Sequence, residues 1–225
     1  MQKASQKKIE DSLLGVHGHP SGVRALLDYV RSFCFDYDIR LKFSRTLSVD
    51  SGDGVPCNGY FDPEDKVLAV AIRKDISDWF PIFLHEFCHA KQFVDDPKWF
   101  FAGCDAEARI FEWAYSRVVV PPKRPIRKYV KLCIDLEKDC EIRTLALVNK
   151  FDIASVVPVE EYAKKANAYL FFWRYFYDVR KWYKKGKAPY ALEDVWTAMP
   201  VDVAIDHMRM PPDIRKVFEA HMVVG

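Results

Sequence analysis

The segment FLHEFCHAKQF, residues 83–93, constrains the fold of this chain more than any other stretch. It places two histidines and a glutamate, His85, Glu86 and His89, inside a run of apolar residues. On a helix, His85 and His89 lie one turn apart on the same face, and Glu86 projects beside them. Because an exposed charged helix would not carry so many apolar neighbours, the sequence predicts a buried helix over about residues 77–93.

These three side chains are typical of a catalytic metal site. Two imidazoles one turn apart can bind a single ion, and this ligand type favours Zn²⁺ over magnesium or calcium. A neighbouring carboxylate can act as general base on a zinc-bound water. We therefore expect His85 and His89 to bind zinc and Glu86 to be catalytic. The simpler alternative is a helix that packs two histidines, and Cys88, next to His89, is expected to be a core thiol.

The sequence offers several candidates for a third zinc ligand, which a catalytic site needs in addition to its open position. LEKDCEIRTL contains Glu137 and Glu141, one turn apart, so that one can bind the metal while the other accepts a ring N–H of a ligand histidine. We expect Glu137 to be the ligand and Glu141 the orienting acid. CDAEARIFEWA offers Asp105 and Glu107 instead. Glu141, Asp105 and Glu107 stay open as alternative ligands.

HEFCH followed by LEKDCE resembles the gluzincin metallopeptidases, whose second motif has the form E-x-x-x-D. Glu137 falls on the ligand glutamate of that motif, and Glu141, an acid but not an aspartate, on the acid that follows. Together with KANAYLFFWRYF and RKWY, over about residues 55–200, the pattern is similar to small metallopeptidases of tailed bacteriophages. DAEARIF resembles the ImmA/IrrE-type peptidases, with Asp105 where their glutamate ligand stands and Arg109 in place of asparagine.

The resemblance implies a zinc metallopeptidase that hydrolyses peptide bonds of a peptide or protein substrate by a Glu86-activated zinc-bound water. Such sites use a tyrosine or histidine to stabilise the oxyanion, and Tyr169 is our first candidate for it, with Asn167, Tyr175 and His207 as others. The alternatives are a zinc hydrolase of a non-peptide bond and a non-catalytic binding or regulatory protein that retains the zinc site. The expected location is the cytoplasm, that of the host cell if the protein is phage-encoded.

The order of the predicted elements indicates an α+β fold, because strands come early and long helices follow. We expect one zincin-like domain over residues 1–225, with a flexible N-terminus at 1–20 and an irregular tail at 186–225. The apolar run at 68–72 predicts a strand buried on both faces, although its edge could instead pair with an extended peptide. The expected helices span about 23–35, 77–93, 104–118, 127–150, 159–185 and 213–221, and the expected strands about 39–49, 57–62 and 66–73.

Composition fits a globular protein. Half of the residues are hydrophobic, and 34 basic against 32 acidic residues give a net charge of +2, so nothing global points to nucleic acid or a membrane. No apolar run approaches a membrane span. The six cysteines form no CxxC pair, which favours free thiols in a reducing compartment. The basic stretch 164–187 is explained by a solvated helix face or by docking of an acidic partner.

Overall fold

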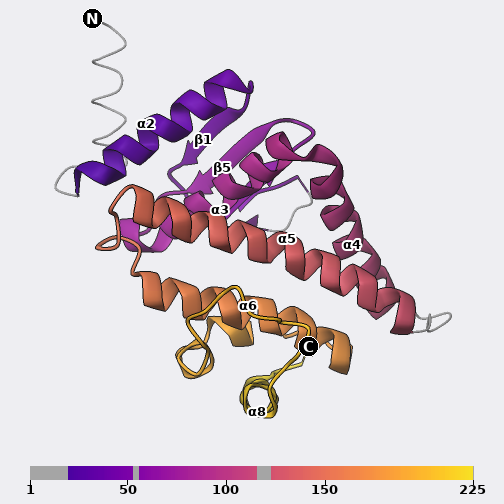
Figure 1. Cartoon of the computed structure of the whole chain (residues 1–225). Coiled ribbons are helices and arrows are strands. Elements are labelled where there is room, and N and C mark those ends of the chain that lie inside the picture. The colour runs from indigo at the N-terminus through magenta and orange to yellow at the C-terminus, as the bar shows by residue number, and fades with distance from the viewer. Residues whose placement is uncertain (1–19, 53–55, 116–122, 225) are drawn as a thin grey trace, which may run out of the picture. The chain divides into compact units, whose positions relative to one another are not determined.

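The computed structural model describes residues 20–52, 56–115 and 123–224 (Figure 1). It confirms the α+β class, with a small mixed sheet among several long helices. Its internal contacts divide the chain into two compact units: unit 1 is Met1–Asp95 with Arg143–Val159, and unit 2 is Asp96–Ile142 with Glu160–Gly225. The single-domain expectation stays a prediction, and the flexible N-terminus falls on residues that lie outside the described part of the chain.

Unit 1 contains the sheet and the motif helix. Its three-stranded sheet has the order β1-β5-β4, with β1 parallel and β4 antiparallel to the central β5. β2 and β3 form a separate antiparallel pair. The strands expected at about 57–62 and 66–73 are therefore present as β4 and β5, an antiparallel pair. Unit 1 consists of α2 (Ser21–Asp36), β1 (Arg40–Ser44), β2 (Val49–Asp50), β3 (Pro56–Cys57), β4 (Gly59–Asp62), β5 (Val67–Ala71), α3 (Ile76–Asp95) and the last residues of α5.

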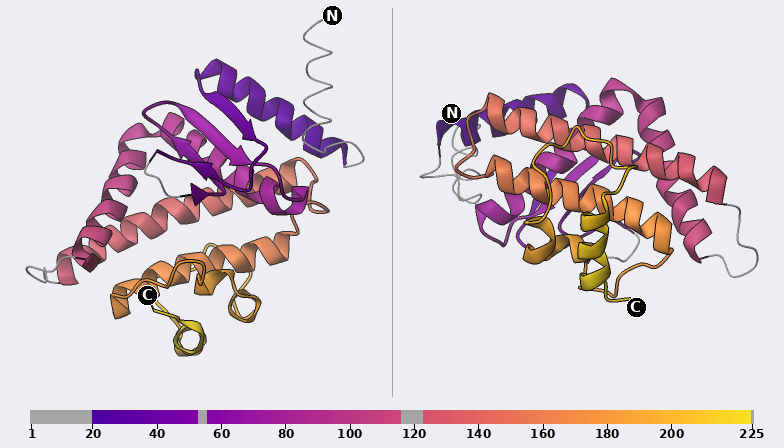
Figure 2. Two further views of the ribbon diagram at one scale, coloured as in Figure 1. Left: turned by 180° about the vertical axis from the view of Figure 1, so that it is seen from behind. Right: turned by 60° about the horizontal axis from the view of Figure 1, so that its bottom comes forward.

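The two faces of the three-stranded sheet differ in polarity. Strand alternation directs Phe43 and Phe61 to the face that α3 covers, where Phe43 packs against Phe83 and Phe61 against Phe93. The opposite face carries charged residues of β1 and β4, and a pocket of about 460 Å³ opens over it. In the left view of Figure 2 the strands of unit 1 lie in front on this side. The pocket is lined by Arg40, Lys42, Asp50, Ser51, Gly52, Tyr60, Asp62, Asp65 and Val67.

All five residues of β5 are buried, as the apolar run predicted. The reason is its central position, since β1 and β4 occupy its two edges and α3 packs on one face. A strand with a neighbour on each side has no free edge, so the suggestion that β5 pairs with a peptide is wrong. The exposed edge of this sheet in unit 1 belongs to its outer strands.

Helix α3 forms because large apolar residues recur along it at helical spacing. Its buried residues are Trp79, Phe80, Phe83, Leu84, Phe87, Cys88, Ala90 and Gln92. Phe87 also meets the rings of Tyr29 and Phe33 on α2 edge-on, at centroid distances of 5.9 and 5.2 Å. Full burial of one such ring stabilises the fold by about 1.5–3 kcal/mol. The motif helix is thus held between α2 and the sheet, and its expected bounds are nearly correct.

Unit 2 is helical, and several of its helix ends differ from expectation, including the start of α5 at Lys123 instead of residue 127. α4 begins at Pro97 instead of residue 104, because Asp96 caps it: the Asp96 carboxylate accepts a hydrogen bond from the Trp99 amide at 2.9 Å. α6 ends at Val179 instead of residue 185, because Arg180 adopts a left-handed φ of 53°. Unit 2 comprises α4 (Pro97–Tyr115), most of α5 (Lys123–Lys150), α6 (Val159–Val179), η1 (Pro189–Ala191), α7 (Glu193–Trp196) and α8 (Pro212–His221).

Close packing in unit 2 depends on a glycine and an aromatic core. A Cβ at Gly103 of α4 would lie 2.4 Å from Leu136 Cδ2 of α5, so only glycine lets the two helices approach this far. On α6, Phe171, Phe172 and Trp173 are fully buried, as expected for this aromatic stripe. The expected irregular tail is only partly irregular, since η1, α7 and α8 lie within it.

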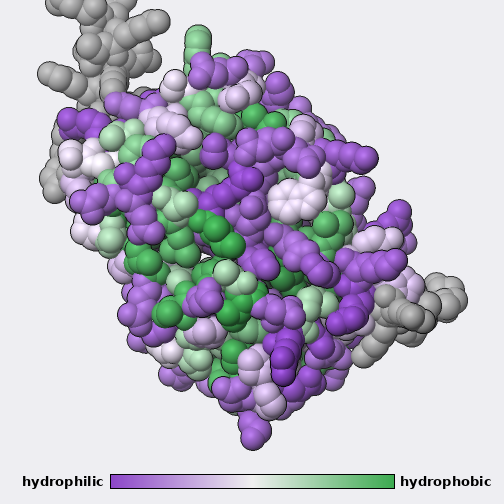
Figure 3. Space-filling model, viewed as in Figure 1, coloured by the Kyte–Doolittle hydropathy of each residue, from purple (hydrophilic) through white to green (hydrophobic). Residues whose placement is uncertain are grey.

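The cysteines and the surface agree with the composition. All six cysteines are free; Cys34, Cys88, Cys133 and Cys140 are buried, Cys57 is half-buried and Cys104 is exposed. Hydrophilic and hydrophobic residues are interspersed on the face shown in Figure 3. In the part of the chain that the structure describes, no helix combines the length and apolarity needed to cross a membrane.

Candidate metal centre

His85 and His89 converge on α3 as the motif spacing requires. Their Nε2 atoms lie 3.1 Å apart, and the two half-buried rings are nearly perpendicular, with an interplanar angle of 88°. Two nitrogens bound to one tetrahedral zinc at 2.0–2.1 Å would be separated by about 3.3 Å. The pair therefore fits a single zinc ion with little adjustment.

Glu86, half-buried on the same helix, lies against strand β4. A Cβ placed on Gly59 of β4 would lie 3.3 Å from Glu86 Cγ and 3.0 Å from Ile82 Cγ2. Glycine at this point lets the backbone of β4 approach the motif helix closely, whereas a side chain would push its neighbours apart. The sheet thus limits the space around the candidate base.

Gln92, on the next turn of α3, contacts the second histidine. Its Oε1 lies 2.8 Å from His89 Nδ1, and the residue is fully buried. Gln92 was not among the candidates predicted from the sequence. Its spacing could have indicated it, because a polar residue three positions after His89 lies on the same helix face as that histidine.

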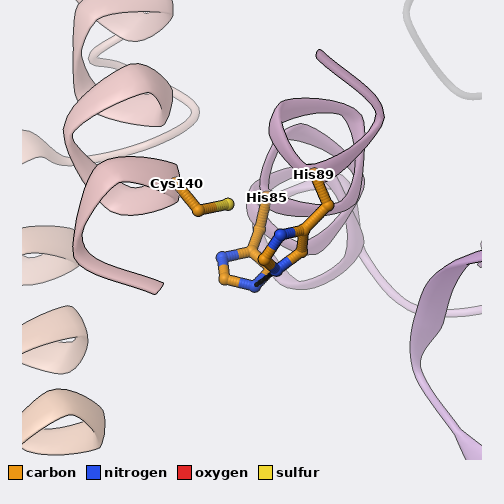
Figure 4. Close-up of side chains that lie close together, drawn as sticks. All are labelled: His85, His89 and Cys140. Atoms are coloured by element: carbon orange, nitrogen blue, oxygen red, sulfur yellow. Dashed lines mark hydrogen bonds between the residues drawn. The ribbon is translucent and has the colours of Figure 1, made fainter. Parts of the chain in front are cut away.

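Figure 4 draws the two rings, which project from α3 toward one another. His85 and His89 belong to a group of side chains that could hold a metal ion. Cys140, also labelled there, is a free and buried thiol of α5 in unit 2.

Glu137 and Glu141, the expected acidic pair, lie on α5 on either side of Cys140. Glu141 is 5% exposed and accepts a hydrogen bond from the Tyr162 hydroxyl of α6. Glu137 is half-buried and is not one of the three residues in Figure 4. The assignments of Glu137 as ligand and of Glu141 as orienting acid stay predictions.

Glu107 and Tyr169 lie near Glu137 within unit 2. Burial of the Tyr169 hydroxyl, followed by the charges of Glu137 and Glu107, raises the pKa of Tyr169 well above its usual value. A phenol that resists ionisation stays a hydrogen-bond donor, which an oxyanion requires. The catalytic role of Tyr169 stays a prediction, as does the alternative assignment of Glu107 as a zinc ligand, while Asp105 is exposed on α4.

The other oxyanion candidates take part in packing within unit 2. The Asn167 amide group donates to the carbonyls of Pro200 and Asp202 at 2.7 and 3.2 Å, and its oxygen accepts from His207 Nε2 at 2.6 Å. His207 is 1% exposed, and burial lowers its pKa to about 4. Tyr175 stacks on Phe218. Asn167 and His207 thus fix the chain after α7 to α6.

The basic stretch 164–187 is partly neutralised by its own helix. Lys164 pairs with Glu160 at 2.7 Å and Lys165 with Glu161 at 2.5 Å, each one turn apart. After α6 the lysines 181, 184, 185 and 187 are exposed. The first half is explained as a solvated helix face, and docking of an acidic partner on the second half stays a prediction.

Comparisons of the chain with family models, with curated proteins and with solved structures found no match.

Proposed function

We propose that this protein is a zinc-dependent metallopeptidase in which His85 and His89 bind the metal and Glu86 is the general base. The observation that carries the proposal is the convergence of the two Nε2 atoms, 3.1 Å apart, on a helix that presents Glu86 next to them. When bound, zinc would lower the pKa of a water molecule to about 7 and so supply a nucleophile near neutral pH.

Glu86 would perform the proton transfers of this reaction. It neighbours His85 in sequence and projects off the axis that joins the two ligands, so its carboxylate can reach the water without occupying a ligand position. It would accept the proton of the attacking water and return it to the leaving nitrogen. Gly59 supports this role, because it keeps the space beside Glu86 clear of a side chain.

For the third ligand, α5 offers Cys140 and Glu137. The Cys140 thiol is buried, and zinc binds cysteine as the thiolate. The resemblance to gluzincins supports the Glu137 carboxylate. Zinc accepts both atom types in catalytic sites that combine histidine with cysteine or glutamate.

The test combines metal content with hydrolysis. Protein purified without added metal is analysed for zinc, and wild type and Glu86→Gln are compared on a mixture of quenched fluorescent peptides. We expect close to one zinc per chain in both proteins, and a loss of cleavage of about 100-fold or more in Glu86→Gln, the usual contribution of a general base. Asp78→Asn, which changes an exposed acid on the same helix, is the control and should cleave like wild type.

Three results would count against the proposal. Absence of zinc after reconstitution would remove the metal site. Unchanged cleavage by Glu86→Gln would mean that another group is the base. Absence of peptide cleavage by zinc-loaded wild type, with turnover of an ester or amide substrate, would favour a zinc hydrolase of a non-peptide bond.

A further inference from the structure

Gln92 is a polar residue on an apolar surface. Its side chain is fully buried, and most of the other buried residues of α3 are aromatic or aliphatic. A buried amide costs free energy unless it is hydrogen-bonded, so a residue of this kind needs a partner that the fold supplies. One such partner is His89, whose Nδ1 lies 2.8 Å from Gln92 Oε1.

This contact determines which nitrogen of His89 carries the proton. An amide oxygen can only accept a hydrogen bond, so His89 Nδ1 must donate. In the neutral imidazole the other nitrogen, Nε2, then holds the lone pair. Nε2 is the atom that faces His85 Nε2 at 3.1 Å. The hydrogen bond that His89 donates to Gln92 therefore leaves the lone pair of His89 Nε2 directed toward His85 Nε2.

We propose that Gln92 is a positioning residue of the metal centre, which holds His89 in the Nδ1–H tautomer with Nε2 available to the metal. This inference rests on the proposed zinc site and adds the residue that prepares it. The contact is local, because residues three apart on a helix are neighbours, so α3 alone carries both the ligand and the group that orients it.

A neutral amide is chemically distinct from the carboxylate that often fills this role. Ligand histidines commonly donate their second N–H to a carboxylate, a carbonyl or water, and loss of such a partner lowers metal affinity by about 10–100-fold. Glutamine supplies the same acceptor geometry without a further negative charge beside the site. Gln92→Glu should thus retain the orientation of the His89 ring, whereas Gln92→Met, with a side chain of similar length, should lose it.

The first experiment reads the tautomer in the metal-free protein. Long-range ¹H–¹⁵N spectra at pH 8 report which imidazole nitrogen is protonated, and a His89→Gln variant assigns the signal. We expect wild type and Gln92→Glu to hold His89 as Nδ1–H, and Gln92→Met to shift it toward Nε2–H. Asn167→Leu removes another buried amide, one with partners on the chain after α7, and should leave the tautomer unchanged.

The second experiment measures affinity for zinc alone by competition with a chromophoric chelator, and the Co²⁺ absorption spectrum. Gln92→Met should bind zinc about 10–100-fold more weakly, while Gln92→Glu should stay within a few-fold of wild type. If Gln92→Met fails to fold, Gln92→Asn, which withdraws the oxygen by one methylene, replaces it in both experiments.

The outcomes separate this inference from the proposed function. An unchanged His89 tautomer in Gln92→Met, or equal zinc affinity in wild type and Gln92→Met, would overturn the role of Gln92. Equal loss of zinc affinity in Gln92→Glu and Gln92→Met would also overturn it, because the glutamate side chain keeps the acceptor oxygen. If wild type binds no zinc, the proposed function fails, and the tautomer in the metal-free protein still decides whether Gln92 sets the state of His89.

Discussion

Two helical stretches carry the candidate ligands, and they are built in different ways. On α3, the polar residues His85, His89 and Gln92 contact one another within two turns of a single helix. On α5, the polar residues are bonded to other elements: Glu141 to Tyr162 of α6, within unit 2, and Arg143 to Asp95 of α3, within unit 1. Helix geometry therefore determines the α3 constellation, whereas tertiary packing determines the environment of the α5 residues.

The largest expected effect is the loss of either α3 histidine. His85→Ala and His89→Ala should each reduce zinc affinity by more than about 100-fold, beyond the effect of removing an orienting group, because a direct ligand bond is lost. Zinc competition titration measures this. Circular dichroism should show a folded helical protein in both variants, since the two rings are only half-buried. Tight zinc binding by either variant would mean that the α3 pair is not the metal site.

The α5 ligand is tested by three substitutions on one helix. We expect Cys140→Ala to lower zinc affinity more than Glu137→Gln does, because a buried thiolate is a softer ligand for zinc than a carboxylate. Glu141→Gln should weaken binding by about 10–100-fold if Glu141 orients a ligand. The measurement is the zinc dissociation constant of each variant under one set of conditions.

The opposite order of zinc-affinity losses would point to the other α5 ligand. A larger loss in Glu137→Gln than in Cys140→Ala would identify the carboxylate of the gluzincin-like motif as the ligand. A Cys140→Ser variant is the matched control for the size of the side chain. Asp105→Asn, which alters an exposed acid of α4, should bind zinc like wild type.

A smaller effect contrasts the α3 histidines with His207 of unit 2. Burial lowers the pKa of His207 from 6.5 to about 4, so between these values the unfolded chain binds the proton more readily than the folded chain. The free energy of unfolding contains this contribution in full above pH 6.5. It loses at most about 3 kcal/mol as the pH falls toward 4. Urea unfolding between pH 4 and 7 measures it.

His207→Gln is the control for that titration, because glutamine can donate to Asn167 but does not ionise in this range. The variant should show a shallower pH dependence than wild type between pH 4 and 6.5. An identical slope in both proteins would mean that His207 titrates normally in the folded state.

The sequence correctly predicted those features of the fold that depend on local geometry. The bounds of α3, the β4–β5 hairpin and the burial of β5 follow from periodicity and turn chemistry. The start of α4 was mispredicted because the Asp96–Pro97 capping signal was overlooked. The end of α6 was not predictable in this way, because a non-glycine residue, Arg180, takes the left-handed conformation there.

The residues of the candidate site also differ in how far the sequence predicts them. His85, Glu86 and His89 follow from one short motif, and Gln92 could have been found from its spacing. The α5 ligand could not be decided, because helical periodicity gives the face of α5 on which a side chain lies but not which side chains of another helix that face would meet. Glu141 is buried and bonded to Tyr162, and nothing in the sequence singled out its burial or its partner.

Gly59 carries a consequence for how this protein could vary. A Cβ at that position would lie 3.0 Å from Ile82 Cγ2, 3.1 Å from the Ala69 carbonyl oxygen of the neighbouring strand and 3.3 Å from Glu86 Cγ, so its neighbours would have to shift by a few tenths of an ångström. Substitutions of Tyr60 or Asp62 change the polar face of β4, whereas a substitution of Gly59 changes the packing around the candidate base. The position of Glu86 therefore depends on a residue that has no side chain of its own.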